Sequence, residues 1–140
     1  QQILEECTDS KYQIIEKMIL PDEKAKIERQ LCRLADQRQI NVVFTTGGTG
    51  FAERDVTPEA TIAVCDKMAP GIAEAMRHYS LSITNRAMLS RAVAGIRKKT
   101  LIINLPGSPK AVKESLEYIL PALGHGLGIL RGTDGECGNA

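Results

Sequence analysis

Tryptophan is absent from the sequence, and phenylalanine and tyrosine together make up only 4% of its 140 residues. Apolar residues nevertheless account for 43%, so the core must be built mainly from isoleucine, leucine, valine and alanine. A domain of this length buries roughly two-thirds of the surface that its unfolded chain exposes. We therefore expect a single domain with an aliphatic core.

Long hydrophobic runs and a strong excess of charge are also missing. No apolar run approaches the roughly 20 residues that a membrane-spanning helix needs, and no signal-peptide pattern opens the sequence. The formal net charge is +1, which gives no electrostatic reason to expect binding to nucleic acid or to an anionic membrane. We expect neither as a partner.

The sequence has no CxxC motif, and its four cysteines, Cys7, Cys32, Cys65 and Cys137, are widely spaced. Zinc sites and disulfide frameworks require closer or paired spacing. This pattern predicts free thiols in a reducing compartment and argues against a zinc site. We accordingly expect a cytoplasmic protein.

The most informative stretch is NVVFTTGGTGFAERDVTPE, residues 41–59. Its apolar run at residues 42–44 has the β-branched character of a buried strand. Glycine permits positive φ and close approach of another molecule, and successive N–H groups can form an anion-binding nest beyond a strand's carboxyl end. The cluster that follows this strand is either such a phosphate cradle or only a tight turn into the next helix. It consists of Gly47, Gly48, Thr49 and Gly50.

A carboxylate follows the glycine cluster at Asp55. Thr57 is a natural N-cap and Pro58 suits the first helical position, so we expect a helix over residues 57–67. A phosphate cradle and a carboxylate able to hold a metal ion would thus lie a few residues apart.

Upstream, residues 12–20 (YQIIEKMIL) read as a strand that Pro21 ends. Asp22 is expected to cap the next helix, whose apolar positions fall on one face. If this strand runs parallel to residues 42–44, Asp22 lies at the same sheet edge as the glycine cluster.

Downstream, residues 70–80 predict a helix that begins at Pro70. Residues 91–97 and 100–105 flank Lys98 and Lys99 and predict a hairpin or a strand-turn-strand unit. A second ligand-type loop follows, with Ser108 as the N-cap of a helix and Pro109 at its first position. The positive end of that helix suits an anion.

Strands that alternate with helices predict a three-layer α/β/α domain with a mostly parallel, mixed sheet. Residues 1–130 would form this domain, and residues 131–140 read as a flexible tail. The two glycine loops would define one crevice for a phosphate-bearing small molecule. Arg54 and Arg91 either supply fixed positive charge there or are solvated surface arginines. No Ser-His-Asp or Cys-His arrangement points to covalent catalysis.

Three strings, GGTGFAERDVTPEAT (47–61), LSRAVAGIRKKTLIINLPGSPKAV (89–112) and ILPALGHGL (119–127), carry a family resemblance. They resemble the molybdenum-cofactor proteins of the MogA type, a family that includes the G domain of gephyrin and its plant counterpart. The resemblance covers roughly residues 12 to 130. Family members carry a first strand and a Ser-Gly-Pro turn ahead of this region, and the 140 residues of this sequence contain neither.

The resemblance implies a molybdopterin adenylyltransferase, in which a phosphate of molybdopterin attacks the α-phosphorus of Mg²⁺-bound ATP and pyrophosphate leaves. It implies that Asp55 is the catalytic group and holds the magnesium. It further implies that Gly47, Gly48, Thr49 and Gly50 hold nucleotide phosphates. Asp22 and the loop Asn104-Leu105-Pro106-Gly107-Ser108 would frame the adenosine, and Ser80, Ser90 and Arg91 would face the pterin.

Family members are trimers, so the resemblance also implies a homotrimer, with a MoeA-type molybdenum insertase as a further partner. The string RDVTPEAT at residues 54–61 favours the adenylyltransferase branch of the family. The alternative is a molybdopterin-binding trimeric scaffold with little or no catalytic activity, as in gephyrin-like or MoaB-like members.

Overall fold

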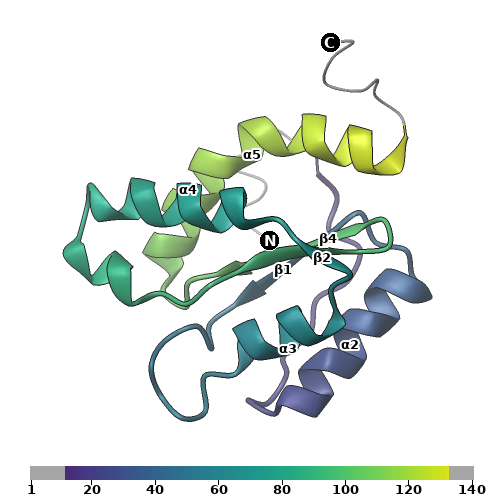
Figure 1. Cartoon of the computed structure of the whole chain (residues 1–140), viewed down its shortest axis with the longest axis horizontal. Coiled ribbons are helices and arrows are strands. Elements are labelled where there is room, and N and C mark those ends of the chain that lie inside the picture. The colour runs from purple at the N-terminus through teal and green to yellow at the C-terminus, as the bar shows by residue number, and fades with distance from the viewer. Residues whose placement is uncertain (1–11, 133–140) are drawn as a thin grey trace.

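The computed structural model describes residues 12–132, which form a four-stranded sheet with helices on both faces (Figure 1). In chain order the elements are α2 (Lys24–Asp36), β1 (Val42–Thr46), α3 (Thr57–Val64), β2 (Lys67–Met68), α4 (Pro70–Leu81), the 3-10 helix η1 (Asn85–Leu89), β3 (Ala94–Arg97), β4 (Thr100–Leu105) and α5 (Pro109–Arg131). None of the helices within residues 12–132 is long and apolar enough to cross a membrane.

The strands lie in the order β1-β4-β3-β2. β1 and β4 are parallel, with Thr46 opposite Leu105, whereas β3 pairs antiparallel with both of its neighbours. The three-layer fold and the mixed sheet are therefore as expected. Parallel pairing is confined to β1 and β4 because the turn at Lys98, where φ is 54°, makes β3 and β4 a hairpin.

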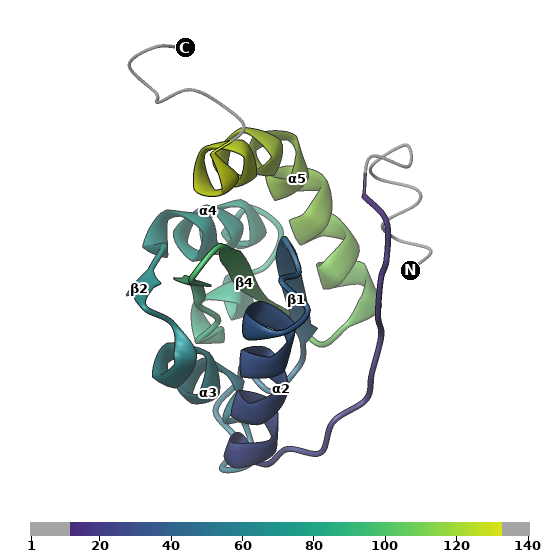
Figure 2. The ribbon, with the colours of Figure 1, turned by 90° about the vertical axis from the view of Figure 1, so that its right-hand side faces the viewer.

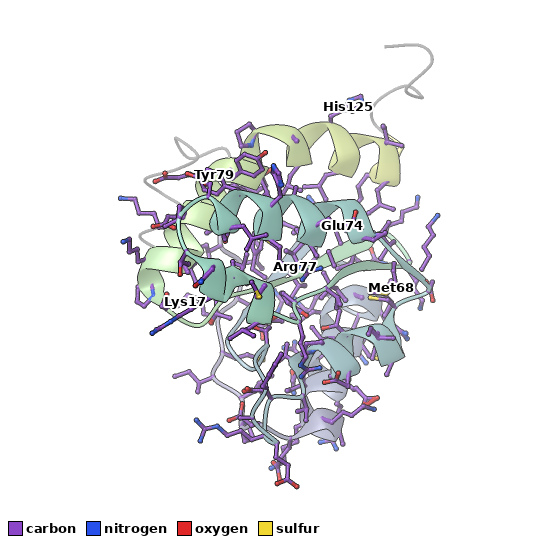
Figure 3. All side chains as sticks on the ribbon, turned by 60° about the vertical axis from the view of Figure 1, so that its left-hand side comes forward. Lys17, Met68, Glu74, Arg77, Tyr79 and His125 are labelled. Atoms are coloured by element: carbon purple, nitrogen blue, oxygen red, sulfur yellow. The ribbon has the colours of Figure 1, made fainter. Side chains whose placement is uncertain are left out.

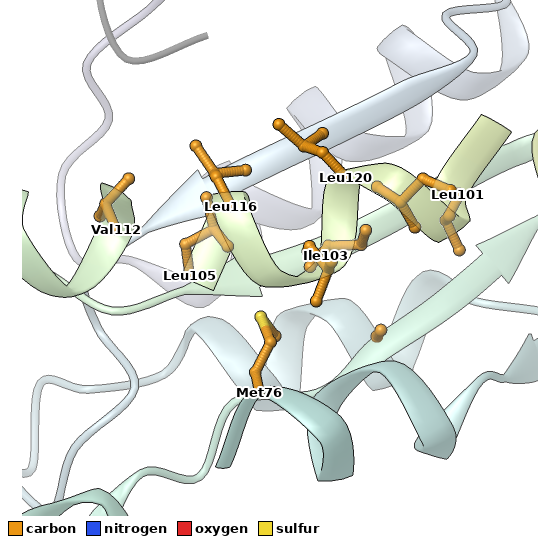
Figure 4. Close-up of a cluster of buried hydrophobic side chains, with 10 residues drawn as sticks. Met76, Leu101, Ile103, Leu105, Val112, Leu116 and Leu120 are labelled. Carbon is orange, nitrogen blue, oxygen red and sulfur yellow. The ribbon is translucent and has the colours of Figure 1, made fainter. Parts of the chain in front are cut away.

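Two aliphatic clusters fill the spaces between the sheet and its helices. On one face, Leu101, Ile103 and Leu105 of β4 pack against α4 and α5 (Figure 4). On the other face, Ile102 packs against α2 and α3. The alternation of side chains along a strand explains why consecutive residues of β4 enter different layers, and all its residues are buried.

This topology brings distant segments to one edge of the sheet. β1 and β4 both end there because they are parallel. β3 begins there because it runs in the opposite direction to β4, with Ala94 opposite Ile103. The segments after Thr46, after Leu105 and before Ala94 are therefore neighbours.

The prediction of a strand at residues 12–20 is wrong. Figure 2 shows this segment as an extended purple stretch along one side of the molecule, and it pairs with none of the described strands. Tyr12 and Leu20 pack against the core at its two ends, while Ile19 between them is 99% exposed. Asp22 is not an N-cap either, because α2 begins after Glu23 and has no side-chain cap.

The helix expected over residues 57–67 ends earlier, at Val64, and its N-cap is one position before the expected Thr57. Val56 holds the N-cap position, so Thr57 is already helical. The helix ends at Val64 because Cys65 turns extended, and Lys67–Met68 then pairs with β3. Residues 67–68 fit the helical pattern of the sequence, but they pair with the edge of β3 and therefore do not extend the helix.

The other helix boundaries agree with the sequence. α4 begins at Pro70, and α5 begins at Pro109 after Ser108, whose hydroxyl accepts a hydrogen bond from Ala111 N at 3.2 Å. The hairpin is confirmed, although its first strand begins at Ala94. Of the expected tail, residues 133–140 lie outside the described residues.

Candidate active site

The glycine loop after β1 has the conformation and the free donors of an anion cradle. Gly47 and Gly48 have φ values of +83° and +69°. Gly47 N donates to Leu105 O at 3.2 Å, which joins this loop to the end of β4. Within the described part of the chain, no hydrogen bond uses the N–H groups of Gly48, Thr49 or Gly50. Unengaged successive N–H groups of this kind suit a phosphate oxygen.

Packing also requires the glycine at position 48. A Cβ atom on Gly48 would lie 2.3 Å from Thr57 Oγ1, and Thr57 N donates to Gly48 O at 3.2 Å. A Cβ atom on Gly107 would lie 3.5 Å from Gly47 Cα, so the loops after β1 and β4 touch. The two glycine loops that were predicted to define one crevice therefore lie next to each other.

Asp55 closes the far end of the glycine loop. Its Oδ2 accepts a hydrogen bond from Ala52 N at 2.9 Å, and its own N–H donates to Ala52 O at 2.9 Å. The carboxylate lies close to Gly50, where an added Cβ would come within 2.9 Å of Oδ2. The charged group therefore sits beside the unengaged N–H groups of the loop.

The donor set fits a substrate-bound magnesium ion. Among residues 12–132 no cluster of three or more His, Cys, Asp or Glu residues could hold a metal ion. Mg²⁺ is commonly bound through one or two carboxylates together with substrate phosphates and water. Asp55 can supply such a carboxylate, with Oδ1 not used by the contact to Ala52.

Arg91 is bound to the glycine loop through both its backbone and its side chain. Arg91 N donates to Thr49 O at 2.8 Å, Nε donates to Gly50 O at 2.8 Å, and Nη2 donates to Asp55 O at 2.7 Å. Nη1 and Nη2 also donate to the carboxylate of Glu59, at 2.6 and 3.3 Å. The hydrogen bond from Arg91 holds the pKa of Glu59 below its ordinary value, and the pKa of Arg91 is raised in turn.

A cavity of about 210 Å³ lies between α4, η1, α5 and the segment that leads into β3. Three residues expected at the ligand site, Ser80, Ser90 and Pro106, line it together. The other lining residues are Ala73, Met76, Arg77, Thr84, Arg86, Ala87, Ala92, Ala111, Glu114 and Ser115. Pro106 immediately precedes Gly107, so one wall of this cavity lies next to the loop after β4.

Arg77 is a site residue that the sequence analysis missed. It lies between α4 and the sheet (Figure 3), and its Nη1 donates to Ala92 O at 2.7 Å and to Ser90 O at 3.5 Å. The sequence did hold a signal, because Ala73, Arg77 and Ser80 recur at helical spacing on one face of α4. Glu59 was also missed, and no local pattern connects it with Arg91, 32 positions away.

The Asn104 side chain is not in the cavity. It is fully buried, where Nδ2 donates to Thr45 Oγ1 and Thr61 Oγ1 at 3.0 Å each, and Oδ1 accepts from Val93 N at 3.1 Å. Asn104 thus joins β1, α3 and the start of β3. The loop from Leu105 to Gly107 can reach the site, whereas this amide supports it from inside.

Neither Asp22 nor Ser108 takes part in the hydrogen bonds that join the glycine loop to Arg91. Asp22 is exposed and precedes α2. Besides Arg91, which is the main cause, the charge of Lys24 lowers the pKa of Glu59, so the start of α2 faces the start of α3. Ser108 is engaged as the N-cap of α5.

Residues 1–125 match the family model described as "Probable molybdopterin binding domain". The chain belongs to this family. It is 52% identical over 111 residues to the molybdopterin adenylyltransferase of Escherichia coli K12, an alignment that covers 79% of this chain and 57% of the relative. It is 51% identical over 115 residues to the molybdopterin adenylyltransferase of Helicobacter pylori 26695, covering 82% of this chain and 65% of the relative.

The fold is also that of solved family members. The crystal structure of the molybdopterin biosynthesis enzyme MoaB from Thermus thermophilus superposes with a TM-score of 0.85 at 44% identity, covering 94% of this chain and 80% of that one. The chain spans between half and two-thirds of the length of the two adenylyltransferases that it matches.

Proposed function

We propose that this chain carries a molybdopterin adenylyltransferase activity. A phosphate oxygen of molybdopterin would attack the α-phosphorus of ATP, the bond from that phosphorus to the bridging oxygen of pyrophosphate would break, and adenylylated molybdopterin and pyrophosphate would leave. One observation carries the proposal: three features lie at one edge of the sheet. They are the loop N–H groups that have no hydrogen-bond partner among residues 12–132, the Asp55 carboxylate and the neighbouring cavity. The names of the relatives at 51–52% identity support it.

The residues divide the work by position. The N–H groups of Gly48, Thr49 and Gly50 would bind nucleotide phosphates. The loop from Leu105 to Gly107, with the nearby Ser108 and Asp22, would bound the nucleotide, and Asn104 would support that loop. Ser80, Ser90 and Pro106 line the cavity and would face the pterin.

Asp55 would hold Mg²⁺, which neutralises charge on the reacting phosphates. The chain contributes positioning and electrostatic stabilisation, which are the main requirements of phosphoryl and nucleotidyl transfer. No side chain of the site is needed as a covalent nucleophile.

We also propose a homotrimer, as the family resemblance implies. Leu81, Ile83, Met88 and Leu89 lie close together in the sequence at the end of α4 and in η1, and each is at least 44% exposed. Apolar residues grouped in this way are typical of subunit contacts. A MoeA-type molybdenum insertase is the partner expected to take up the product, and a cytoplasmic location remains a prediction.

The direct test incubates the purified chain with molybdopterin, Mg²⁺ and ATP labelled on the α-phosphate. We expect the label to appear on molybdopterin together with stoichiometric pyrophosphate, and Asp55→Asn provides the inactive comparison. Binding of molybdopterin with no label transfer by the unsubstituted chain would support the non-catalytic scaffold instead.

A further inference from the structure

We propose that Arg91 is a positioning residue, which locks the glycine loop against α3 and thereby fixes Asp55 beside the phosphate-binding N–H groups. This role rests on the proposed function and deepens it. It also replaces the expectation that the Arg91 fork binds a phosphate of the pterin.

Arg91 bridges the loop from one side to the other. Nε reaches the carbonyl of Gly50 and Nη2 reaches the carbonyl of Asp55, at 2.8 and 2.7 Å. The backbone N–H of Arg91 adds a third contact, to Thr49 O at 2.8 Å. Carbonyls at the two ends of the turn from Gly50 to Asp55 are thus held by one planar group, whose geometry a lysine ammonium does not reproduce.

Glu59 of α3 holds the same guanidinium from the side of the helix. Glu59 lies in the first turn of α3, and its carboxylate receives Nη1 at 2.6 Å and Nη2 at 3.3 Å. Nε, Nη1 and Nη2 of Arg91 therefore all donate to the protein already. A fork occupied in this way has little capacity left for a bidentate contact to a phosphate.

The backbone on both sides of Arg91 is itself anchored. Arg77 of α4 donates to the carbonyls of Ser90 and Ala92, the two neighbours of Arg91. Ser90 and Ala92 line the cavity. Arg91 thus connects the wall of the cavity with the glycine loop, which is the relation a positioning residue needs if two substrates are to meet in line.

The chain offers a matched control at the other end of the sheet. Arg97 donates from Nε and Nη2 to the Asp36 carboxylate at 2.9 and 2.8 Å, and from Nη1 to Val64 O at 2.8 Å. This fork has the same chemistry as that of Arg91 but touches no residue of the site. Arg97→Lys therefore controls for the loss of one arginine fork.

The first experiment measures amide hydrogen exchange in the ligand-free full chain. Arg91→Lys should raise exchange of the Ala52 and Asp55 amides, which are hydrogen-bonded within the loop, by about 10-fold or more, with β4 unchanged, because local opening becomes easier. Arg97→Lys should leave residues 48–56 as in the wild type. Glu59→Gln keeps a neutral acceptor and should give a smaller increase than Arg91→Lys. Unchanged exchange of the loop in both Arg91→Lys and Glu59→Gln would overturn the proposal.

The second experiment separates positioning from ligand binding by kinetics. Arg91→Lys should lower kcat by about 10- to 100-fold, the scale of a misplaced catalytic group, while the KM values for ATP and molybdopterin change by less than about 3-fold. A KM for molybdopterin raised about 10-fold or more at near-normal kcat would show that Arg91 is a ligand and would overturn the proposal. If the wild type proves inactive, the proposed function fails, and the exchange experiment alone decides whether Arg91 holds the loop.

Discussion

Gly48 and Thr57 pack so closely that a Cβ atom on Gly48 would lie 2.3 Å from the buried hydroxyl of Thr57. The contact explains why the loop after β1 needs glycine even in the absence of a ligand. Gly48→Ala should lower the free energy of unfolding by about 2–4 kcal/mol, since the steric clash adds to the strain of positive φ. Urea unfolding measures this. Gly71→Ala is the control, because its Cβ would meet nothing within 4 Å and helix propensity favours it. Equal stability of the two variants would contradict the packing argument.

Asp55→Asn should abolish most adenylyl transfer and leave the melting temperature nearly unchanged. The asparagine Oδ1 can still accept the hydrogen bond from Ala52 N, so the turn survives while the charge for Mg²⁺ is lost. Asp55→Ala removes both and should also loosen the loop. Activity and thermal unfolding are measured together. Near-normal turnover of Asp55→Asn at saturating Mg²⁺ would reduce Asp55 to a structural loop residue.

Asn104→Ala should destabilise the protein by about 2–4 kcal/mol, because it removes the three hydrogen bonds of a buried amide and leaves Val93 N without its acceptor. Urea unfolding again provides the measurement. Asn85→Ala, at the exposed start of η1, should change stability by less than about 0.5 kcal/mol. A comparable small effect at both positions would mean that water replaces the Asn104 network.

The free energy of unfolding should fall as the pH drops from about 5 to 2. Hydrogen bonds from Arg97 hold the pKa of Asp36 below its ordinary value of 3.8. The stabilisation is therefore complete above the unfolded pKa and is lost as the pH falls through the folded one. Asp36→Asn should be less stable than the wild type at pH 7 and should show a shallower slope in acid. Glu117→Gln, an exposed control, should follow the wild-type curve, and a parallel curve for Asp36→Asn would refute the assignment.

Cys65 should react slowly with thiol reagents in the folded protein. Burial, followed by the charge of Asp66, raises the pKa of its thiol to about 11. At pH 8 the rate of carbamidomethylation should be on the order of 100-fold below that of a thiol with an ordinary pKa. Peptide mass spectrometry after timed iodoacetamide treatment reports the rate, and unfolding in concentrated urea should restore ordinary reactivity. Rapid modification of Cys65 in the native state would disprove its protection.

The sequence predicted those parts of the fold that local chemistry decides. Ser108 and Pro109 mark the start of α5 because a hydroxyl cap and a proline are a local signal. Residues 12–20 were misassigned because an apolar, β-branched pattern describes a strand without supplying its partner. The same kind of signal placed the N-cap of α3 one residue too late, at Thr57. Val56 holds the N-cap position, and the Thr57 hydroxyl lies against Gly48.

The residues of the candidate site likewise include some that the sequence predicts and others that only tertiary packing reveals. The glycine loops and Asp55 are visible in the sequence because their residue types are chemically distinctive and contiguous. Tertiary packing alone pairs Arg91 with Glu59 and moves the Asn104 amide into the interior. Both depend on the reversal of β3 relative to β4, which places the residues before β3 at the edge where β1 ends.

That arrangement also determines when the site can form during synthesis of the chain. In residues 12–132 β1 pairs with β4 alone, and the side chains of Thr45 and Asn104 that join them are 59 positions apart. Contacts this distant must overcome loop-closure entropy before they stabilise anything, which slows their formation. Because it comes earlier in the sequence, the glycine loop leaves the ribosome well before Arg91 and β4. The site can therefore be assembled only when the second half of the chain folds back upon the first.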